Sequence, residues 1–281
     1  MGIMIQGTAS DVGKSIIATV CCRLLNEEGV KVAPFKAQNM TSETYLLNEQ
    51  LEIALSQAIQ AYAACTKPSV WMNPILFKLG SEDDANVRLL EKYVQCSQGT
   101  LQRTDYYKKS LVIVKQSIQQ LSRTYDVIVY EGAGSPVELN LKDNDIVNMK
   151  VASVADVPVL LVADISRGGV FASIVGTLAL LNKAEHRRVK GIIINKFRGD
   201  ISSFQQGVQL IEAKTNIPVV GVIPDVDDHI VKAIENPPRE RDSDRQEMRL
   251  YNDHIQKFTQ IVKMHMDWEK VKLIMKRWNK S

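Results

Sequence analysis

A glycine-rich stretch near the start of the chain combines the residue types that bind phosphate. The sequence QGTASDVGKSI runs from Gln6 to Ile16 and contains the triplet Gly13, Lys14 and Ser15. Glycines let the backbone approach a polyanion closely, successive N–H groups point at its oxygens, and a helix N-terminus adds a favourable field. In such loops the lysine bridges the β- and γ-phosphates and the serine hydroxyl binds Mg²⁺. The stretch therefore predicts a phosphate-binding loop.

The first glycine of this loop lies one residue earlier than in the strict P-loop pattern. That pattern places a glycine where this chain has Thr8, and the glycine here is Gly7. A Gly-Lys-Ser triplet at an ordinary strand–helix turn is the alternative, but an apolar run precedes the loop and a helical pattern follows it. We expect the nucleotide to contact these loop residues: Gly7, Thr8, Val12, Gly13, Lys14, Ser15 and Ile16.

A second feature is the sequence YDVIVYEGAGSP, in which an apolar run ends at Glu131 and a glycine turn follows. An acid at a strand tip beside a phosphate loop binds magnesium in many nucleoside triphosphatases, where the residue is usually an aspartate. A solvated loop acid is the alternative interpretation. Because the phosphate loop is also present, we predict that Ser15 and Glu131 bind Mg²⁺.

The sequence IIINKFRGD places Asn195 at the end of another apolar run, as a candidate contact for the nucleotide base. Guanine-binding proteins use the pattern Asn-Lys-x-Asp, whereas the fourth position here is Arg198. The missing acid favours ATP over GTP. Lys196 and Arg198 either contact the ligand or are surface charges, and the sequence leaves both interpretations open.

Six short apolar runs, rich in Val, Ile and Leu, predict the strands that position these residues: Gly2–Gln6, Lys31–Phe35, Asp126–Tyr130, Pro158–Asp164, Val189–Asn195 and Ile217–Ile223. Nearly continuous apolar runs are typical of parallel strands that are covered on both faces. Helical patterns alternate with them, including Lys14–Glu28, which Gly29 ends, and an apolar stripe from Tyr107 to Leu121. The order predicts an α/β fold with a doubly wound, mostly parallel sheet, whose ligands lie at the carboxyl ends of the strands.

Composition narrows the class of protein. The chain has 281 residues, of which 45% are hydrophobic and 24% charged, as expected for a soluble globular protein. A net charge of +3 does not indicate a nucleic-acid-binding protein. The cysteines form no CxxC pair, which favours buried thiols in a reducing compartment. The sequence shows no basic leader, and its most apolar window, Val170–Leu181, is shorter than the roughly 20 residues of a membrane span. We expect a cytoplasmic protein.

The chain divides, by this interpretation, into a nucleotide-binding domain at 1–235 and a linker with a helical tail at 236–281. A polar stretch at 80–100 interrupts the strand–helix alternation, and two short runs within it suggest a small excursion. The stretch ENPPRERDSDRQE is rich in proline and charge and predicts an exposed linker. Beyond it we expect two helices that pack onto the domain or onto a second subunit, the last one capped by Asp267.

The motifs GTASDVGKS, PFKAQNM, MNPILFK, EGAGSPVELNLKDNDIVNM, VADISRGGVFASIVGTLALL and VKGIIINKFRGD together resemble the ATP-binding domain of glutamine-dependent cobyric acid synthases. That domain belongs to the dethiobiotin-synthetase-like group of P-loop proteins. The resemblance covers residues 1–225 and implies an ATP-dependent amide ligase that acts on a corrinoid. Members of the family phosphorylate carboxylates of cobyrinic acid a,c-diamide, and ammonia then displaces the phosphate.

The resemblance also implies roles for further residues. Lys36, in PFKAQNM, would contact the γ-phosphate or the substrate carboxylate and act with Lys14 as a catalytic residue. Neutral hydrogen-bonding groups that suit substrate amides and acids follow it and also form the glycine turn: Gln38, Asn39, Gly132, Ala133, Gly134 and Ser135.

Asp11 places a carboxylate inside the phosphate loop. An acid beside triphosphate in a dry site is repelled by several kcal/mol unless a cation intervenes. We predict that Asp11 faces Mg²⁺, Lys14 or Lys36 and orders that catalytic cluster. The alternative is that Asp11 caps the backbone of the following helix.

Several positions depart from the family pattern on the side where a corrinoid would bind. Where the family has Glu-Ile-Gly-Arg-Ala-Gln this chain has EIALSQ, so Glu52 and Gln57 remain while Ala54 and Leu55 replace the Gly-Arg pair. Glu52 stays a candidate metal ligand, but the lost arginine was a planar binder of carboxylates. Ser166 replaces an acid, and Leu79-Gly80 replaces Pro-Thr. The acid substrate therefore stays open.

Family members carry a C-terminal glutaminase domain with a catalytic cysteine, whereas no cysteine follows Cys96 here. We therefore expect ammonia to come from solution or from a separate glutaminase subunit, and the resemblance implies a homodimer. Two other functions stay open. One is a different dethiobiotin-synthetase-like ligase that activates a carboxylate or carbamate, and the other is a non-catalytic ATP-binding partner subunit.

Overall fold

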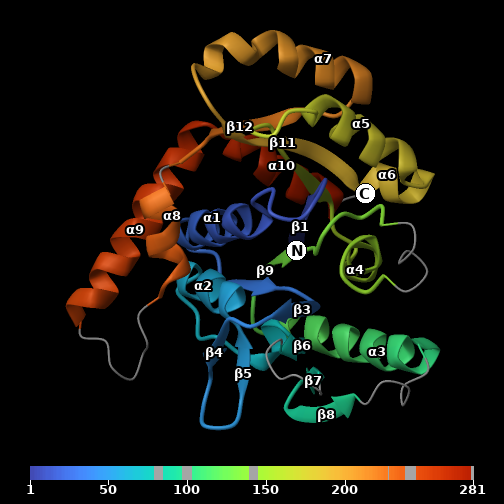
Figure 1. Ribbon diagram of the computed structural model, residues 1–281, viewed down its shortest axis with the longest axis vertical. Coiled ribbons are helices and arrows are strands. Elements are labelled where there is room, and N and C mark those ends of the chain that lie inside the picture. Colours follow the sequence, from blue (N-terminus) through green and yellow to red (C-terminus); the bar gives the residue numbers. More distant parts are fainter. Residues whose placement is uncertain (79–84, 97–102, 139–144, 227, 238–244, 280–281) are drawn as a thin grey trace.

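The computed structural model describes residues 1–78, 85–96, 103–138, 145–226, 228–237 and 245–279. A six-stranded sheet in the order β12-β11-β10-β1-β9-β2 forms its centre (Figure 1). All of its neighbouring strands are parallel, and the strands are β1 (Gly2–Gly7), β2 (Val32–Phe35), β9 (Val127–Glu131), β10 (Val159–Asp164), β11 (Val189–Phe197) and β12 (Val219–Pro224). The predicted α/β fold with a doubly wound parallel sheet is confirmed.

Helices cover both faces of this sheet. Side chains alternate between the two faces along each strand, so an apolar strand presents apolar side chains on both sides. On β1, Met4 belongs to one core cluster, while Ile3 and Ile5 belong to the other. The helices are α1 (Lys14–Glu27), α2 (Leu55–Ala63), α3 (Arg103–Ser122), α4 (Met149–Ala155), α5 (Val170–Leu180), α6 (Lys183–Arg188), α7 (Gln205–Thr215), α8 (Asp228–Glu235), α9 (Arg245–Met264) and α10 (Trp268–Trp278).

Helix α1 ends at Glu27, one residue before the predicted Glu28. Its apolar side, which includes Ile17, Val20 and Leu24, is buried. Gly29 follows the helix with φ 78°, a left-handed conformation that glycine adopts without strain. Cys21 lies on the same buried face, and burial raises the pKa of its thiol to about 12, as expected of a structural cysteine.

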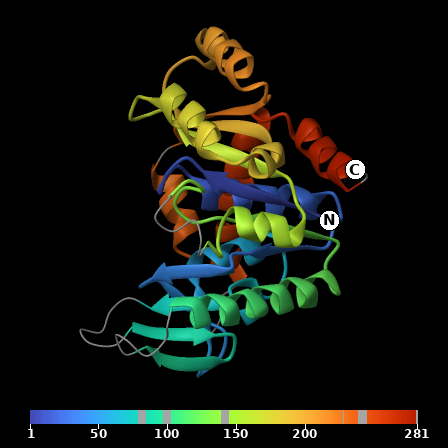
Figure 2. The same cartoon turned by 90° about the vertical axis from the view of Figure 1, so that its right-hand side faces the viewer.

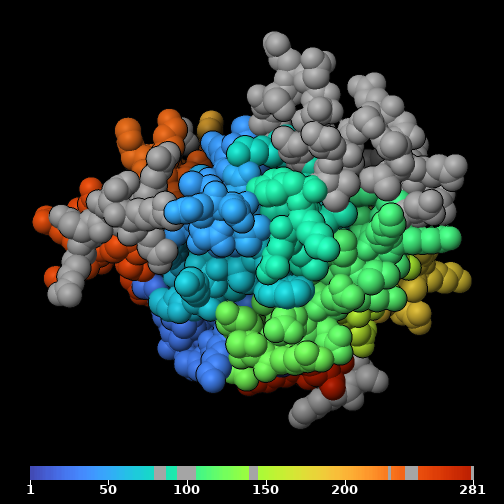
Figure 3. Space-filling model, turned by 90° about the horizontal axis from the view of Figure 1, so that it is seen from below, coloured from blue at the N-terminus to red at the C-terminus, as the bar shows by residue number. Residues whose placement is uncertain are grey.

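A second, four-stranded sheet lies beside the carboxyl end of β2. Its order is β3-β6-β7-β8, with β3 (Gln38–Thr41), β6 (Ile75–Lys78), β7 (Ala85–Leu89) and β8 (Lys92–Cys96), and a hairpin of β4 (Thr44–Leu46) and β5 (Glu52–Ala54) precedes α2. The predicted excursion is the β7–β8 hairpin, while Leu79 and Gly80 lie outside the described residues. Figure 2 shows this sheet and α3 at the opposite end of the molecule from α7, and Figure 3 shows the face that they form.

The C-terminal helices pack onto the main domain. Tyr251, Ile255, Phe258 and Val262 of α9 are buried in the core cluster that contains α1. The predicted linker lies between α8 and α9, although Arg245–Glu247 already belongs to α9, and 238–244 lie outside the described residues. The predicted cap is confirmed, because a side-chain oxygen of Asp267 accepts a hydrogen bond from the backbone N–H of Lys270 at 3.0 Å. In the described part of the chain, no helix combines the length and apolar character of a membrane span.

Candidate active site

The carboxyl ends of the central strands surround a cleft of about 700 Å³. The ends of β1, β2, β9 and β11, with the loops that follow them, bring residues from distant parts of the chain to this cleft. Its lining includes the candidates Asp11, Gly13, Lys14, Ser15, Ile16, Lys36, Glu131, Ala133, Gly134 and Asn195. The volume lies in the range of small-molecule sites.

The loop between β1 and α1 has the backbone of an anion site. Gly13 has φ 99°, and a Cβ at this position would collide with the side chain of Asn195. Gly7 is similarly enclosed, since its Cβ would lie 2.6 Å from Val12. Gly13 is the N-cap residue of α1, no side chain caps that end, and the first turn contains no acid. The first N–H groups of α1 therefore remain available to an anion.

Glu131 is the centre of the polar network at this cleft. Its side chain is only 1% exposed. Oε1 accepts hydrogen bonds from Ser15 Oγ at 2.7 Å and Lys36 Nζ at 2.8 Å, and Oε2 accepts from Gln60 Nε2 at 2.6 Å and Gln57 Nε2 at 3.3 Å. Burial alone would raise the pKa of Glu131, but the charge of Lys36 and these hydrogen bonds outweigh it and lower the pKa. The carboxylate is thus ionised at neutral pH.

Lys14 connects the phosphate loop to the glycine turn. Its Nζ donates to the carbonyl of Ala9 at 2.7 Å and to the carbonyl of Gly134 at 3.0 Å. Burial lowers the pKa of Lys14, and the charge of Glu131 opposes this effect. Both bonded groups are neutral carbonyls, so an anion in the cleft would be the first charged group bonded directly to this ammonium.

Asn148 fixes the glycine turn, a role that no sequence pattern indicated. Its Nδ2 donates to the carbonyl of Ala133 at 2.7 Å, and its Oδ1 accepts from the backbone N–H of Ala133 at 3.2 Å. A Cβ on Gly132 would collide with Asn148. Ser135 donates its N–H to Glu138 at 3.0 Å. The turn therefore has a rigid shape beside Lys14.

Strand β11 holds the phosphate loop from its outer side. Asn195 Nδ2 donates to the carbonyl of Val12 at 2.9 Å, and Lys196 Nζ donates to the carbonyl of Asp11 at 2.7 Å. Lys196 also pairs with Asp164 at 3.0 Å. Lys196 and Arg198 both line the cleft, as does Asp225, the ion-pair partner of Arg198.

Asp11 lies on the exposed part of the loop with φ 58°. The capping alternative is wrong, because Gly13 is the N-cap residue of α1 and no side-chain bond caps the helix. The charge of Asp11 instead acts on Lys14, where it favours the protonated form.

The structure places Glu52 in a different cluster, and its expected position beside the metal ligands is corrected. Its carboxylate accepts hydrogen bonds from Thr44 at 2.5 Å, from Lys78 at 3.0 Å and from Tyr93 at 3.2 Å. These bonds keep it with the second sheet, and it does not line the cleft. The burial of Glu52 would raise its pKa, but hydrogen bonds from Thr44 and Lys78 lower it.

The two polar candidates after Lys36 lie on β3. Gln38 accepts a hydrogen bond from the hydroxyl of Tyr106 at 3.0 Å. Asn39 donates to Gln57 Oε1 at 3.0 Å, and Gln57 in turn donates to Glu131, so Gln57 links Asn39 to Glu131. Ser166 also lines the cleft, and its hydroxyl donates to Asp164 at 2.7 Å.

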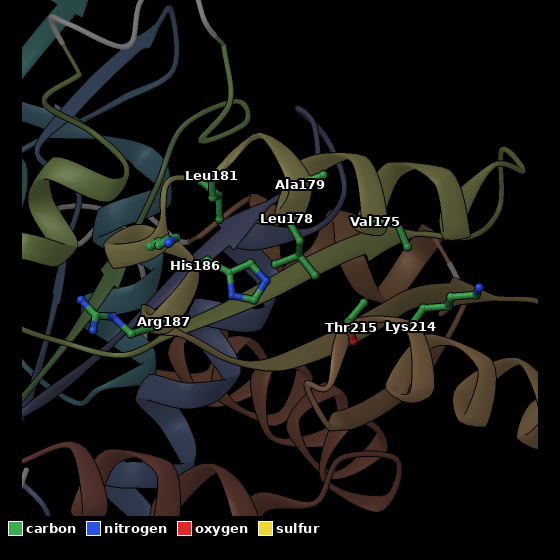
Figure 4. Close-up of a pocket in the computed structure, with 9 residues that line it drawn as sticks. Val175, Leu178, Ala179, Leu181, His186, Arg187, Lys214 and Thr215 are labelled. Carbon is green, nitrogen blue, oxygen red and sulfur yellow. The ribbon is translucent and has the colours of Figure 1, made fainter.

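A second hollow, of about 690 Å³, lies between α5, α6 and α7 (Figure 4). Its lining includes Val175 and Leu178, and His186 lies close to Leu178, while Arg187 and Lys214 extend toward opposite sides. No carboxylate and no glycine loop belong to its described lining. The two hollows have similar volumes, so the donor groups, and not the size, identify the cleft at Glu131 as the candidate active site.

Residues 3–237 match the model of the CobQ/CobB/MinD/ParA nucleotide-binding domain. The chain belongs to this family. The nucleotide-binding domain is 50% identical over 231 residues to the cobyric acid synthase of Caldanaerobacter subterraneus, which covers 81% of this chain and 45% of that protein. It is 49% identical over 240 residues to the cobyric acid synthase of Yersinia enterocolitica, covering 84% of this chain and 47% of that protein.

The chain thus spans about half the length of the curated relatives that it matches. The resemblance to cobyric acid synthases is confirmed for the nucleotide-binding domain. Among solved structures, the MinC:MinD cell division protein complex of Aquifex aeolicus is similar at a TM-score of 0.46 and 15% identity, with 94% of each chain covered.

Proposed function

We propose that this nucleotide-binding domain is the synthetase part of an ATP-dependent amide ligase, which converts cobyrinic acid a,c-diamide to cobyric acid. One observation carries the proposal. Ser15, Lys36 and Glu131 form a hydrogen-bonded cluster at the mouth of the phosphate loop, in which Lys36 and Glu131 are buried. The identity of about half of the aligned residues to cobyric acid synthases supports the choice of a corrinoid substrate.

The residues present fit a magnesium–nucleotide complex. Magnesium prefers oxygen ligands, and in nucleotide sites it takes one or two protein oxygens with phosphate and water for the rest. Ser15 and Glu131 offer a hydroxyl and a carboxylate in contact with one another. We propose that these two residues hold Mg²⁺, that the loop from Gly7 to Ile16 holds the phosphates of ATP, and that Asn195 lies beside the base. When bound, Mg²⁺ neutralises charge on the phosphates.

The chemistry requires cations beside the transferred phosphoryl group. A carboxylate is a poor acyl donor because its oxyanion does not leave, whereas an acyl phosphate has a good leaving group. Transfer of the γ-phosphoryl group to the substrate acid, with release of ADP, forms that acyl phosphate. Lys14 and Lys36 stabilise the charge that develops during this transfer. Burial lowers the pKa of Lys14, while the charge of Glu131 and, more weakly, that of Asp11 favour its protonated form.

Ammonia then attacks the acyl carbon, phosphate leaves and the resulting amide loses a proton. We propose that Gln38, Asn39 and the turn Gly132–Ser135 orient the substrate, since the turn borders Lys14 and Asn39 is bonded to Gln57. Ammonia is supplied from outside this chain, from solution or from a glutaminase subunit. Burial raises the pKa of Cys21 and of Cys22, so neither thiol serves as a glutaminase nucleophile. A homodimer is part of the same proposal, on the family resemblance.

Mass spectrometry tests this function. The protein is incubated with cobyrinic acid a,c-diamide, ammonium and Mg·ATP, and each converted acid changes the product mass by the difference between OH and NH₂. A reaction without ATP and a Glu131→Gln variant are the controls, and both should give unchanged substrate.

Phosphate release separates the two alternative functions. Release that depends on a diamino acid and bicarbonate, with no corrinoid amide, would identify a different carbamate-activating ligase. ATP binding with no turnover on any acid would identify a non-catalytic partner subunit. The substitutions at Ala54, Leu55 and Ser166, on the substrate side, are the reason to measure both.

A further inference from the structure

Gln60, on α2, contacts Glu131 from the side opposite the cleft. Its side chain is fully buried, and Nε2 donates to Glu131 Oε2 at 2.6 Å and to the carbonyl of Ser15 at 3.4 Å. Gln57, one helical turn earlier, donates to the same carboxylate oxygen at 3.3 Å. Residues three apart share one helix face, so α2 presents two amides to one oxygen.

The two oxygens of Glu131 therefore have separate partners. Oε1 accepts from Ser15 and Lys36, which both line the cleft. Oε2 accepts from Gln57 and Gln60, which do not line it. The amides fix the rotation of the carboxylate about its last bond, with Oε1 turned toward the cleft and Oε2 toward α2.

The amide of Gln60 has only one workable orientation. The reversed amide would place its oxygen against the carboxylate oxygen, where neither carries a proton to share. In the orientation present, Gln60 Oε1 is buried without a hydrogen-bond partner among the described residues. An unpaired buried acceptor destabilises the fold, and a methionine of similar volume would avoid it. A residue that only filled the core would not need this amide.

We propose that Gln60 is a positioning residue that orients the carboxylate of Glu131 toward the magnesium–nucleotide complex. This inference rests on the proposed function, because it takes Glu131 as a magnesium ligand. Gln60 also bonds the carbonyl of Ser15, so it contacts both residues that are proposed to bind Mg²⁺. Partners behind a metal ligand typically change metal affinity by roughly 10- to 100-fold when they are removed.

The test compares Gln60→Met with Thr259→Val. Both substitutions remove a buried polar group, and Thr259 lies on α9 with its hydroxyl unpaired among the described residues. Calorimetry measures ATP binding with Mg²⁺ and with a chelator. Gln60→Met should weaken Mg·ATP binding by roughly 10- to 100-fold and leave metal-free ATP binding unchanged. Thr259→Val should change neither.

Two results would overturn the proposal. One is a folded Gln60→Met protein with the magnesium dependence of the wild type, and the other is an equal loss with and without Mg²⁺. If Gln60→Met does not fold, Gln60→Asn replaces it, since this variant keeps an amide but shortens its reach by one methylene. For Gln60→Asn, the result that supports the proposal and the results that overturn it are the same as for Gln60→Met.

A crystal structure of the variant separates this inference from the proposed function. If the wild type binds no Mg·ATP, the proposed function fails, and the position of Glu131 still decides the role of Gln60. A carboxylate that turns away from Ser15 in the variant supports the positioning role. A carboxylate that keeps both bonds, to Ser15 and to Lys36, overturns it.

Discussion

The hydroxyl of Ser15 donates a hydrogen bond of 2.7 Å to Oε1 of Glu131, although 116 residues of chain separate the two. The parallel pairing of β1 with β9 produces this contact, since Ile5 lies beside Glu131 in the register. The loop that leaves β1 and the tip of β9 consequently meet at one edge of the sheet. Ser15 and Glu131, the two proposed magnesium ligands, thus meet because β1 and β9 are neighbours in the sheet.

Replacing Lys14 by methionine should weaken ATP binding by roughly 10- to 100-fold, because hydrogen bonds to charged groups contribute about 1.5–3 kcal/mol. The variant removes the buried ammonium that now bonds the carbonyls of Ala9 and Gly134. Calorimetric titration with Mg·ATP measures the loss. Lys108→Met, at an exposed site on α3, is the control and should bind normally. Equal affinity in both variants would contradict the assigned role of Lys14.

Gly13→Ala should destabilise the fold by about 1–2 kcal/mol, because at positive φ a Cβ lies too close to the following carbonyl oxygen. It should also weaken nucleotide binding, because the new Cβ would displace Asn195 from the loop. Gly176→Ala is the matched control, as its Cβ would lie in open space within α5. That change should stabilise the protein by roughly 0.5–1 kcal/mol. Urea unfolding measures both, and a Gly13→Ala protein as stable as the wild type would exclude the strain.

The ion pair of Glu131 predicts a loss of stability in acid. Its pKa is lower in the folded protein than its ordinary value of 4.5. The unfolded chain therefore binds the proton first, and the contribution to stability is fully present above pH 4.5 and falls as the pH drops through the folded value. Glu131→Gln removes this titration, so the free energy of unfolding of the variant should vary less with pH below 4.5 than that of the wild type. Urea unfolding at a series of acidic pH values checks this, and parallel curves for the two proteins would contradict it.

Asp267→Ala should lower the free energy of unfolding by about 1 kcal/mol, the usual cost of losing an N-cap. Asp267 accepts the hydrogen bond from the N–H of Lys270 and so caps α10, which packs into the main core. Asp253→Ala, at an exposed site on α9, should stay within about 0.5 kcal/mol of the wild type. Urea unfolding compares the two. If Asp267→Ala is as stable as the wild type, the cap makes no contribution to stability.

Local patterns were enough to predict the central sheet and the phosphate loop. The runs that became β1, β9, β10 and β11 are nearly continuous in apolar residues, as is typical of parallel strands that are covered on both faces. The second sheet had no such signal. Strand β3 has the sequence QNMT, whose residues are partly exposed, and its pairing with β6 depends on segments far apart in the chain.

Glu52 shows where residue type misleads. An acid retained from the family motif suggested a metal ligand, but side-chain hydrogen bonds hold it against Thr44 and against Lys78 of β6. Gln60 shows the converse. An uncharged residue in a helix gives no chemical signal, and only the packing of α2 against Glu131 gives it a role.

The amino-acid sequence alone determined the nucleotide-binding loop, the acid at the strand tip and the succession of strands along the chain, because backbone chemistry and apolar periodicity are local properties. The tertiary structure alone decided which side chains surround Glu131 and which, like Glu52, lie elsewhere. Contacts across the fold depend on strand register and helix packing, and these emerge only when distant segments bury their surfaces together.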